Sequence, residues 1–236
     1  SVTLIFAIYL VERNLDTSFV KSYPPDTPNL FFLDIQPSQL DDFKALLGIP
    51  SEYYPIVRAR VLAVNGEAID RQKERRRRGD NLARVFNLTY RHHLLTDESL
   101  LEGQKLFRDD IKGAQVSLLD TVQEIRPMEI GDRITFRIGG IPLDATITSI
   151  RTRTKESLRP FFYFVFPQDL LGSAPQTIFT AINVPQTMVA DLQNRMVSRF
   201  PNISVVDVTE ALAVVAGVMQ KLSKTVRFFT AFSIVA

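Results

Sequence analysis

Two adjacent histidines, His92 and His93, are the side chains best suited to metal binding or proton transfer. Asp97 and Glu98 follow them closely, and imidazole and carboxylate groups together are common zinc ligands. Neighbouring side chains of a strand point to opposite faces, however, and a His-x-x-x-His spacing is absent. We therefore expect a surface or structural role for both histidines. A stand-alone hydrolase or metalloenzyme that uses either of them is the competing hypothesis.

The segment RQKERRRRGD is the second group of residues that could carry chemistry. It contains four consecutive arginines, Arg75, Arg76, Arg77 and Arg78. Such a run can hold the phosphates of a lipid or a nucleic acid. Asp70, Glu74 and Asp80 lie in the same stretch, however, and no aromatic residues interleave for base stacking. A solvated loop is the favoured interpretation, contact with anionic lipid or a partner is the alternative, and nucleic acid is not expected.

Sequence patterns of the common catalytic sites are missing. The chain has no Cys, which excludes disulfides, thiolate chemistry and cysteine metal sites. The GxSxG and P-loop patterns are absent as well. The formal net charge of +2 indicates neither a nucleic-acid binder nor a strongly acidic partner. We therefore expect no enzymatic activity, no cofactor and no metal.

The clearest structural element is the stretch GDRITFRIGGIPLDATITSI. Apolar and polar residues alternate on both sides of a Gly-Gly pair, which accepts the positive φ angles of a tight turn. A turn at this pair places Ile138 opposite Ile141 and Phe136 opposite Leu143. Because apolar residues then meet on one face, register and pattern agree, and the stretch predicts a β-hairpin.

A strand-like run followed by proline and an amphipathic helix occurs twice. In NLFFLDIQPSQLDDFKALLG the apolar helix face consists of Leu40, Phe43 and Leu47. In QTIFTAINVPQTMVADLQNRMVSRF it consists of Val189, Leu192, Met196 and Phe200. Each helix leads into another strand-like stretch, YYPIVRARVLAV or NISVVDV. The chain therefore predicts two βαβ units.

These two units define the predicted fold class, which is α+β. Placed side by side, they make a split βαβ, ferredoxin-like lobe, which we assign to residues 21–64 and 168–208. The region between them, 65–167, contains the hairpin and the strand-like runs RVFNLTYR and PFFYFVF. We expect it to be an inserted, β-rich lobe.

Both ends of the chain are unusually apolar, and each is predicted to be a helix: residues 1–20 and residues 209–236. The stripe on the first consists of Leu4, Ile8, Val11 and Leu15. The stripe on the second consists of Leu212, Val215, Met219, Leu222, Val226 and Phe229. Steps of three and four residues form a heptad seam. The two helices are therefore expected to pack against each other as an antiparallel stalk.

The apolar ends also suggest a membrane. The apolar runs Val2 to Val11 and Phe228 to Ala236 are each too short to cross a bilayer, because a spanning helix takes about 20 residues. We interpret them as the end of one transmembrane helix and the start of another. Arg227, just before FFTAFSIVA, is placed to reach a headgroup layer. A buried two-helix layer that covers a sheet is the alternative.

Several stretches occur in an order that resembles one family. These are PPDTPNLFFLDIQPSQLDDFKALL, YYPIVRARVLAVNGE, RVFNLTYR, MEIGDRITFRIGG with ATITSIR, and FPNISVVDVTE. Together they resemble the extracytoplasmic domain of MacB-like and FtsX-like ABC transporter permeases, with the greatest similarity to the YbbP type. The resemblance covers essentially the whole chain.

This resemblance implies an architecture and a function. It implies a porter-like βαβ lobe interrupted by a smaller β-rich (Sabre-like) lobe, held in the periplasm between two helices of the bacterial inner membrane. It implies a separate cytoplasmic ATPase subunit, whose ATP hydrolysis moves the stalk and the domain together (mechanotransmission). Hydrophobic or lipid-like cargo, membrane lipid and a periplasmic lysophospholipase-like esterase are the implied cargo and partners. The alternatives are a soluble partner-binding module and a hydrolase-activating domain without transport.

Overall fold

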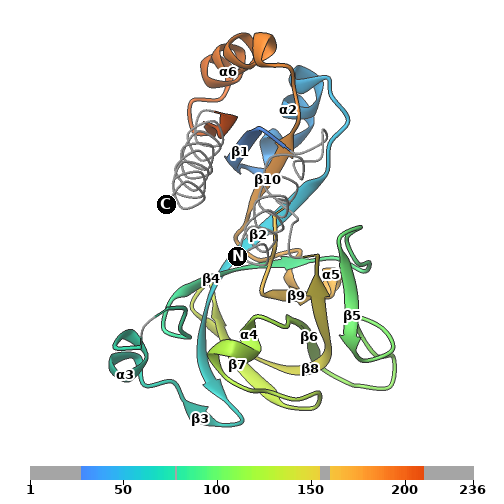
Figure 1. The fold of residues 1–236 in the computed structure, drawn as a ribbon, viewed down its shortest axis with the longest axis vertical. Coiled ribbons are helices and arrows are strands. Elements are labelled where there is room, and N and C mark those ends of the chain that lie inside the picture. Colours follow the sequence, from blue (N-terminus) through green and yellow to red (C-terminus); the bar gives the residue numbers. More distant parts are fainter. Residues whose placement is uncertain (1–27, 78, 155–159, 210–236) are drawn as a thin grey trace, which may run out of the picture. The chain divides into compact units, whose positions relative to one another are not determined.

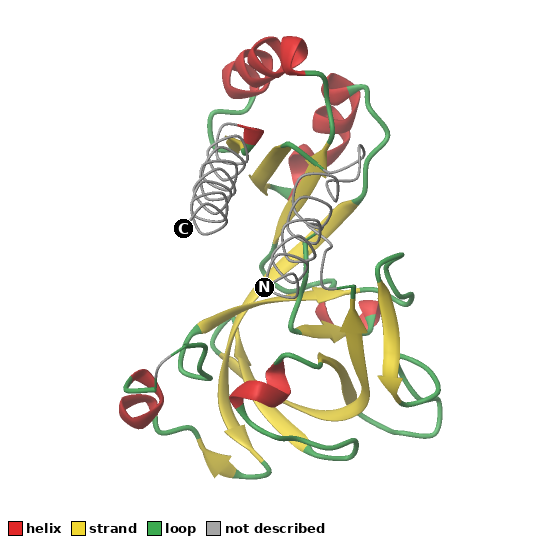
Figure 2. Cartoon of the chain, in the orientation of Figure 1, coloured by secondary structure: helices red, strands yellow, loops and turns green. Residues whose placement is uncertain are grey.

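The computed structural model describes residues 28–77, 79–154 and 160–209 (Figures 1 and 2). The predicted stalk seam lies outside these residues on both sides, because its positions fall within 1–27 and 210–236. At the coarse level the described chain is a mixed α and β fold, as predicted.

The chain forms two compact units, which we describe one at a time. The small unit contains, among the described residues, 28–32 and 181–209, and the barrel unit contains residues 33–180. The boundary between them falls inside strands β1 (Leu30–Ile35) and β10 (Thr177–Ile182).

A closed ring of strands forms the core of the barrel unit. The main strands of this unit are β2 (Tyr53–Val64), β4 (Val85–Tyr90), β5 (Glu98–Glu102), β6 (Ala114–Leu119), β7 (Arg133–Ile138), β8 (Ile141–Arg153) and β9 (Phe164–Phe166). Pairing runs from β2 through β4, β9, β6, β8 and β7 and returns to β2. Six strands therefore close into a barrel, whose curvature can be followed in Figure 1, and β5 attaches to β8 outside the ring. Closure removes the free edges of these strands.

Strands β7 and β8 form the predicted hairpin in the predicted register. Ile138 pairs with Ile141, and Phe136 pairs with Leu143. The two turn glycines have φ angles of 56° and 92°, as a tight hairpin turn with two left-handed residues requires. Apolar residues therefore meet on one face as predicted, and along this face Phe136 is buried whereas Ile141 is 71% exposed. Ile141 lies at the hairpin tip, where residues 139–142 are all exposed.

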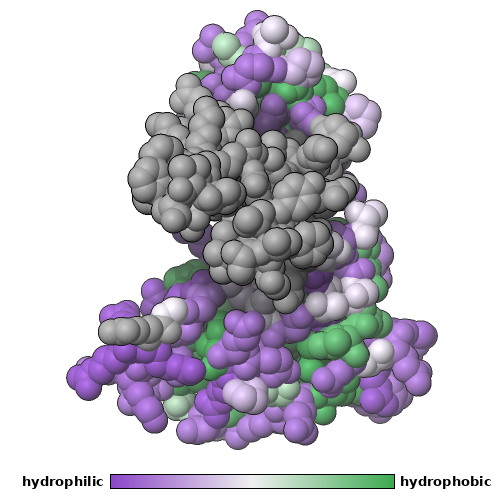
Figure 3. All heavy atoms as spheres, in the orientation of Figure 1, coloured by the Kyte–Doolittle hydropathy of each residue, from purple (hydrophilic) through white to green (hydrophobic). Residues whose placement is uncertain are grey.

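Aromatic rings fill the barrel core. Phe164 packs edge-on against Phe86 and Phe136, with ring centroids 5.1 Å apart in each pair. Phe136 also packs against Phe166 at 5.3 Å. Strand β2 contributes to the same core with Val57, Ala59, Val61 and Val64. Hydrophilic residues cover most of the barrel surface that is visible in Figure 3, with hydrophobic residues showing between them.

The two predicted amphipathic helices are present. Helix α6 (Gln186–Arg199) buries Val189, Leu192 and Met196, and Phe200 directly after it is buried too. Helix α2 (Leu40–Leu47) follows a short 3-10 turn, η2 (Pro37–Gln39), and buries Phe43 and Leu47. Leu40 of the predicted face is only partly buried. Gly48 ends α2 with φ 64°, the left-handed geometry expected of a helix-ending glycine.

Asn29 joins three segments of the small unit. Its backbone N–H donates to the carbonyl of Ile182 at 2.9 Å, and its carbonyl accepts from the N–H of Val208 at 3.0 Å. Its side-chain amide exchanges two hydrogen bonds with the backbone of Val184. This arrangement links the chain next to β1 with β10 and with the end of β11 (Ser204–Asp207).

The remaining elements are short: β3 (Glu67–Ala68), α3 (Arg71–Arg75), α4 (Val122–Ile125) and α5 (Gln168–Leu171). The division into a porter-like lobe and an inserted lobe stays a prediction. No helix within the described residues is both long enough and apolar enough to cross a membrane.

Candidate functional site

His92 and His93 do not lie on a strand, contrary to the geometry assumed from the sequence. They follow the end of β4 in a bend, and both side chains are exposed. The backbone carbonyl of His93 accepts a hydrogen bond from Arg91 Nε at 2.9 Å. Among the described residues, no group of three or more His, Asp or Glu side chains is arranged to hold a metal ion.

The carboxylates near these histidines face arginines instead. Glu98 lies at the centre of a buried charge cluster that the sequence did not reveal. One carboxylate oxygen accepts from Arg151 Nη1 at 2.5 Å, and the other accepts from Arg91 and from the backbone N–H of Leu95. Asp97 forms an ion pair with Arg153 at 3.6 Å. These contacts connect strands β5 and β8 with the chain that follows β4.

Arg151 is the most deeply buried cation of the barrel, with 0% of its surface exposed. Besides Glu98, it donates to Ser117 Oγ at 3.0 Å and to the carbonyl of Phe162 at 3.0 Å. Burial lowers its pKa to about 10, while the attraction of Glu98 acts against that fall. The guanidinium therefore remains charged at neutral pH. Since the folded chain releases this proton more easily than the unfolded chain, this group makes the free energy of unfolding vary with pH only above about pH 10, where it rises with pH.

Arg91 shows the same balance more weakly. Burial lowers its pKa, and the nearby charge of Glu98 counteracts the effect. Glu98 is thus the main negative charge that faces these two buried guanidinium groups, with smaller contributions from Asp97 to Arg91 and from Asp120 to Arg151. Most polar atoms of this cluster are bonded within the protein, although Arg91 Nη1 is buried with no hydrogen-bond partner. We interpret the cluster as a structural tie between strands.

The acidic residues around the arginine run form hydrogen bonds or ion pairs with groups close to them in the chain. Asp70 caps α3 by accepting the backbone N–H groups of Gln72 at 2.9 Å and Lys73 at 3.1 Å. Glu74 turns inward and accepts the N–H of Leu82 at 3.0 Å, and its other oxygen lies 3.5 Å from Arg77. Asp70 and Glu74, two of the three acidic residues in this stretch, therefore accept hydrogen bonds from its backbone.

The third carboxylate, Asp80, is also occupied. It pairs with Arg84 and accepts from the hydroxyl of Tyr163 at 2.6 Å. Four cations of the run have no acidic partner among the described residues: Arg71, Lys73, Arg75 and Arg76. Arg78 lies outside the described residues. The loop therefore presents a net positive surface, on which these four cations are free of direct ion pairs within the described residues.

A second basic surface lies on the barrel wall. Arg58 and Arg60 project from the exposed face of β2, and Arg137 of β7 pairs directly with Arg60. None of these three arginines was predicted to belong to a site. Their alternation in VRAR and FRI was visible in the sequence, but the pairing of β2 with β7 brings them together.

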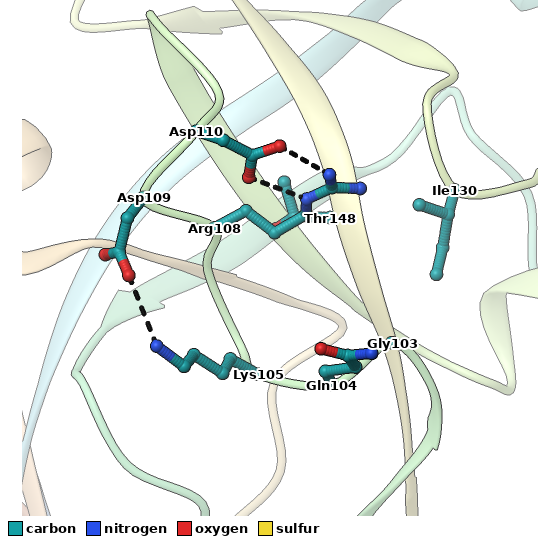
Figure 4. A pocket seen from close by; sticks show the side chains of 8 residues that line it. All are labelled: Gly103, Gln104, Lys105, Arg108, Asp109, Asp110, Ile130 and Thr148. Atoms are coloured by element: carbon teal, nitrogen blue, oxygen red, sulfur yellow. Dashed lines mark hydrogen bonds and ion pairs between the residues drawn. The ribbon is translucent and has the colours of Figure 1, made fainter.

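A cavity of about 480 Å³ beside β8 is lined by several charged side chains (Figure 4). Its lining residues are Gly103, Gln104, Lys105, Arg108, Asp109, Asp110, Ile130 and Thr148. Arg108 donates two hydrogen bonds to Asp110, at 2.9 and 2.5 Å, and Lys105 donates to Asp109 at 3.2 Å.

The charges of this cavity therefore neutralise one another. The hydrogen bond from Arg108 lowers the pKa of Asp110, so that the carboxylate remains ionised beside its partner. Gly103 lies directly against β8, where a Cβ would approach Ser149 Cβ to 3.1 Å. The cavity is a polar hollow with no nucleophile–base pair among its lining residues, and it does not indicate catalysis.

Comparison with known proteins gives one informative match. No protein-family model matches the chain. The chain is 29% identical over 212 residues to an uncharacterized ABC transporter permease, YbbP, of Escherichia coli (strain K12). The alignment covers 87% of this chain and 25% of the relative, so the chain spans about a quarter of that protein's length. The predicted resemblance to a permease of the YbbP type is confirmed.

A solved structure is also similar to this chain. The extracellular domain of the noncanonic ABC-type transporter YknZ from Gram-positive bacteria matches with a TM-score of 0.35 and 8% identity. The match covers 80% of this chain and 94% of that domain.

Proposed function

We propose, from its resemblance to YbbP, that this chain is a non-catalytic periplasmic domain of an ABC transporter permease. The observation that carries the proposal is the alignment with that permease over 212 residues. The site geometry is in keeping with it, since the buried carboxylate is tied to arginines and the described cavity is self-neutralised. On this proposal the domain belongs to the bacterial inner membrane and works in the periplasm.

The proposed mechanism is mechanotransmission. A separate cytoplasmic ATPase subunit hydrolyses ATP, the stalk helices move, and the periplasmic domain follows as a rigid body. A lever of this kind needs a packed seam, which we assign to the apolar stripes of residues 4–15 and 212–229. The closed barrel with its aromatic core supplies a stiff body for such a lever to move.

The proposed cargo is hydrophobic or lipid-like. Membrane lipid and a periplasmic lysophospholipase-like esterase are the proposed partners. The surface around Arg75 to Arg78 is proposed to contact anionic lipid or a partner, because the cations of that loop exceed the carboxylates that reach them.

The seam can be tested in the whole permease reconstituted with its ATPase. Leu222→Asp places a charge in the proposed seam, and Gln220→Asp places the same charge beside it. We expect Leu222→Asp to uncouple ATP hydrolysis from transport and Gln220→Asp to change little. Both rates are measured together, and circular dichroism checks that the domain stays folded. Near-normal coupling in both variants would remove the mechanical role of the seam.

A second measurement separates a permease domain from a soluble module. The gene that encodes this chain is expressed at full length, and its product is fractionated. Extraction from membranes only with detergent supports the permease. A full-length product that stays in the aqueous fraction, or one that activates a hydrolase without transport, would overturn the proposal.

A further inference from the structure

Three arginines share the outer wall of the barrel, and we call them the arginine face: Arg58, Arg60 and Arg137. Strands β4, β2 and β7 lie side by side there. Arg60 pairs with Arg137 on one side and with Val85 on the other, and Arg58 pairs with Asn87. All five side chains are exposed, so they belong to one face of the sheet.

The arginine face carries an electrostatic cost. Like charges directly opposite each other on paired strands destabilise a sheet. None of the three arginines has an acidic partner among the described residues. The nearest carboxylate by register, Asp144, accepts the hydroxyl of Thr135 at 2.6 Å. Like charges that face each other on a sheet in this way are expected where the surface binds a ligand or partner of opposite charge.

The backbone beneath these arginines is firmly held. On the other side of the same strands, Val57, Ala59 and Val61 of β2 lie in the barrel core together with Phe136. Directly paired residues of antiparallel strands lie about 4.5–5.5 Å apart at their Cα atoms, and i, i+2 residues lie roughly 7 Å apart along a strand. The three guanidinium groups can therefore converge on one small anion.

We propose that the arginine face binds the phosphate of an anionic phospholipid headgroup. A phosphodiester carries two charged oxygens and two ester oxygens at the corners of a tetrahedron, so it can accept from guanidinium groups that approach from different directions. The two oxygens of a carboxylate lie in one plane, which suits fewer directions of approach. The exposed amide of Asn87 is placed for the hydroxyl groups of a headgroup, and Val85, which is 46% exposed, offers an apolar contact beside Arg60.

The composition of this face favours a lipid over a protein partner. Protein interfaces concentrate their binding energy in buried aromatic anchors. The residues around the arginine face are an amide, a valine and further polar side chains, with no exposed aromatic ring at the paired positions. A layer of lipid headgroups needs charge complementarity more than shape complementarity. This inference rests on membrane lipid as a proposed partner and assigns it a further contact site. The binding itself requires neither the ATPase nor a moving stalk, so it can fail while the permease assignment holds.

The test is co-sedimentation of the 236-residue chain with lipid vesicles. Phosphatidylcholine vesicles containing phosphatidylglycerol are compared with vesicles given the same surface charge by oleate. Removing two charges with Arg60→Gln/Arg137→Gln should weaken binding to phosphatidylglycerol vesicles roughly 30-fold. The control, Lys105→Gln/Arg195→Gln, removes the same charge from two exposed, ion-paired residues and should bind nearly as the parent does.

The double variant Arg60→Lys/Arg137→Lys separates the effect of positive charge from that of guanidinium geometry. It keeps the positive charge and removes the planar fork, so the preference for phosphatidylglycerol over oleate should fall while binding to both persists. Thermal unfolding of the glutamine variant should occur at the parent's temperature or above it, because a repulsion has been removed.

Three results would overturn the proposal. One is equal loss in the arginine-face variant and its control, which would mean general electrostatics. Another is equal binding of the parent to oleate and phosphatidylglycerol vesicles, which would mean that phosphate is not recognised. The third is no binding of the parent to either anionic vesicle, which would leave an acidic protein as the occupant of this face.

Discussion

Glu98 is the carboxylate that forms ion pairs with both buried arginines, Arg91 and Arg151. All three side chains are at most 8% exposed. Removing one partner of a buried ion pair leaves an uncompensated charge, which costs about 3–5 kcal/mol. We expect Glu98→Ala to lower the free energy of unfolding by that amount, measured by urea denaturation followed by circular dichroism.

Glu102→Ala is the matched control for this prediction. It removes the same group from the same strand, β5, but its side chain is exposed. Exposed substitutions of this kind usually change stability by less than about 0.5 kcal/mol. Similar stabilities for the two variants would show that the cluster contributes little to the fold.

At the scale of elements, the hairpin turn of β7 and β8 makes the sharpest demand on residue type. Gly140 has φ 92° and Gly139 has φ 56°. A β-branched residue strongly disfavours such angles, whereas Asn tolerates the left-handed region. We expect Gly140→Val to lower the free energy of unfolding by about 1–2 kcal/mol and Gly139→Asn to be nearly neutral.

Thermal unfolding of the two turn variants, measured side by side, checks this expectation. Nothing lies within 4 Å of a Cβ added at Gly140, so a loss there reports backbone strain and not a steric clash. An unchanged midpoint for Gly140→Val would mean that the turn adapts and that the glycines do not set the hairpin.

At the scale of the whole molecule, β2 decides where an independent folding unit begins. It pairs with both β4 and β7 and gives four residues to the core. We expect a fragment of residues 33–180 to unfold cooperatively. A fragment of residues 65–167, the predicted inserted lobe, should remain unfolded because its barrel cannot close.

Amide exchange measured by NMR distinguishes the two fragments. Protected amides in β4 and β7 of the longer fragment and none in the shorter one are the expected result. Protection in the shorter fragment would instead support the predicted boundary between residues 64 and 65.

The sequence alone determined the features that depend on neighbours in the chain. The buried face of α6 and the register of the β7–β8 hairpin follow from local periodicity and turn residues, because residues a few positions apart must share a face. The order of short motifs likewise predicted the likeness to a YbbP-type permease, which the alignment confirmed.

Only the tertiary structure decided which distant charges meet. The pairing of β2 with β7 sets Arg60 beside Arg137, and that of β5 with β8 sets Glu98 beside Arg151. Strand pairing between distant segments leaves no local periodic signal, so the barrel closure and both clusters were missed. The same holds for Glu74, which accepts from the backbone of Leu82 with one oxygen and pairs with Arg77 with the other. Charge counts add residues along a chain, whereas electrostatic balance depends on the distances that folding creates.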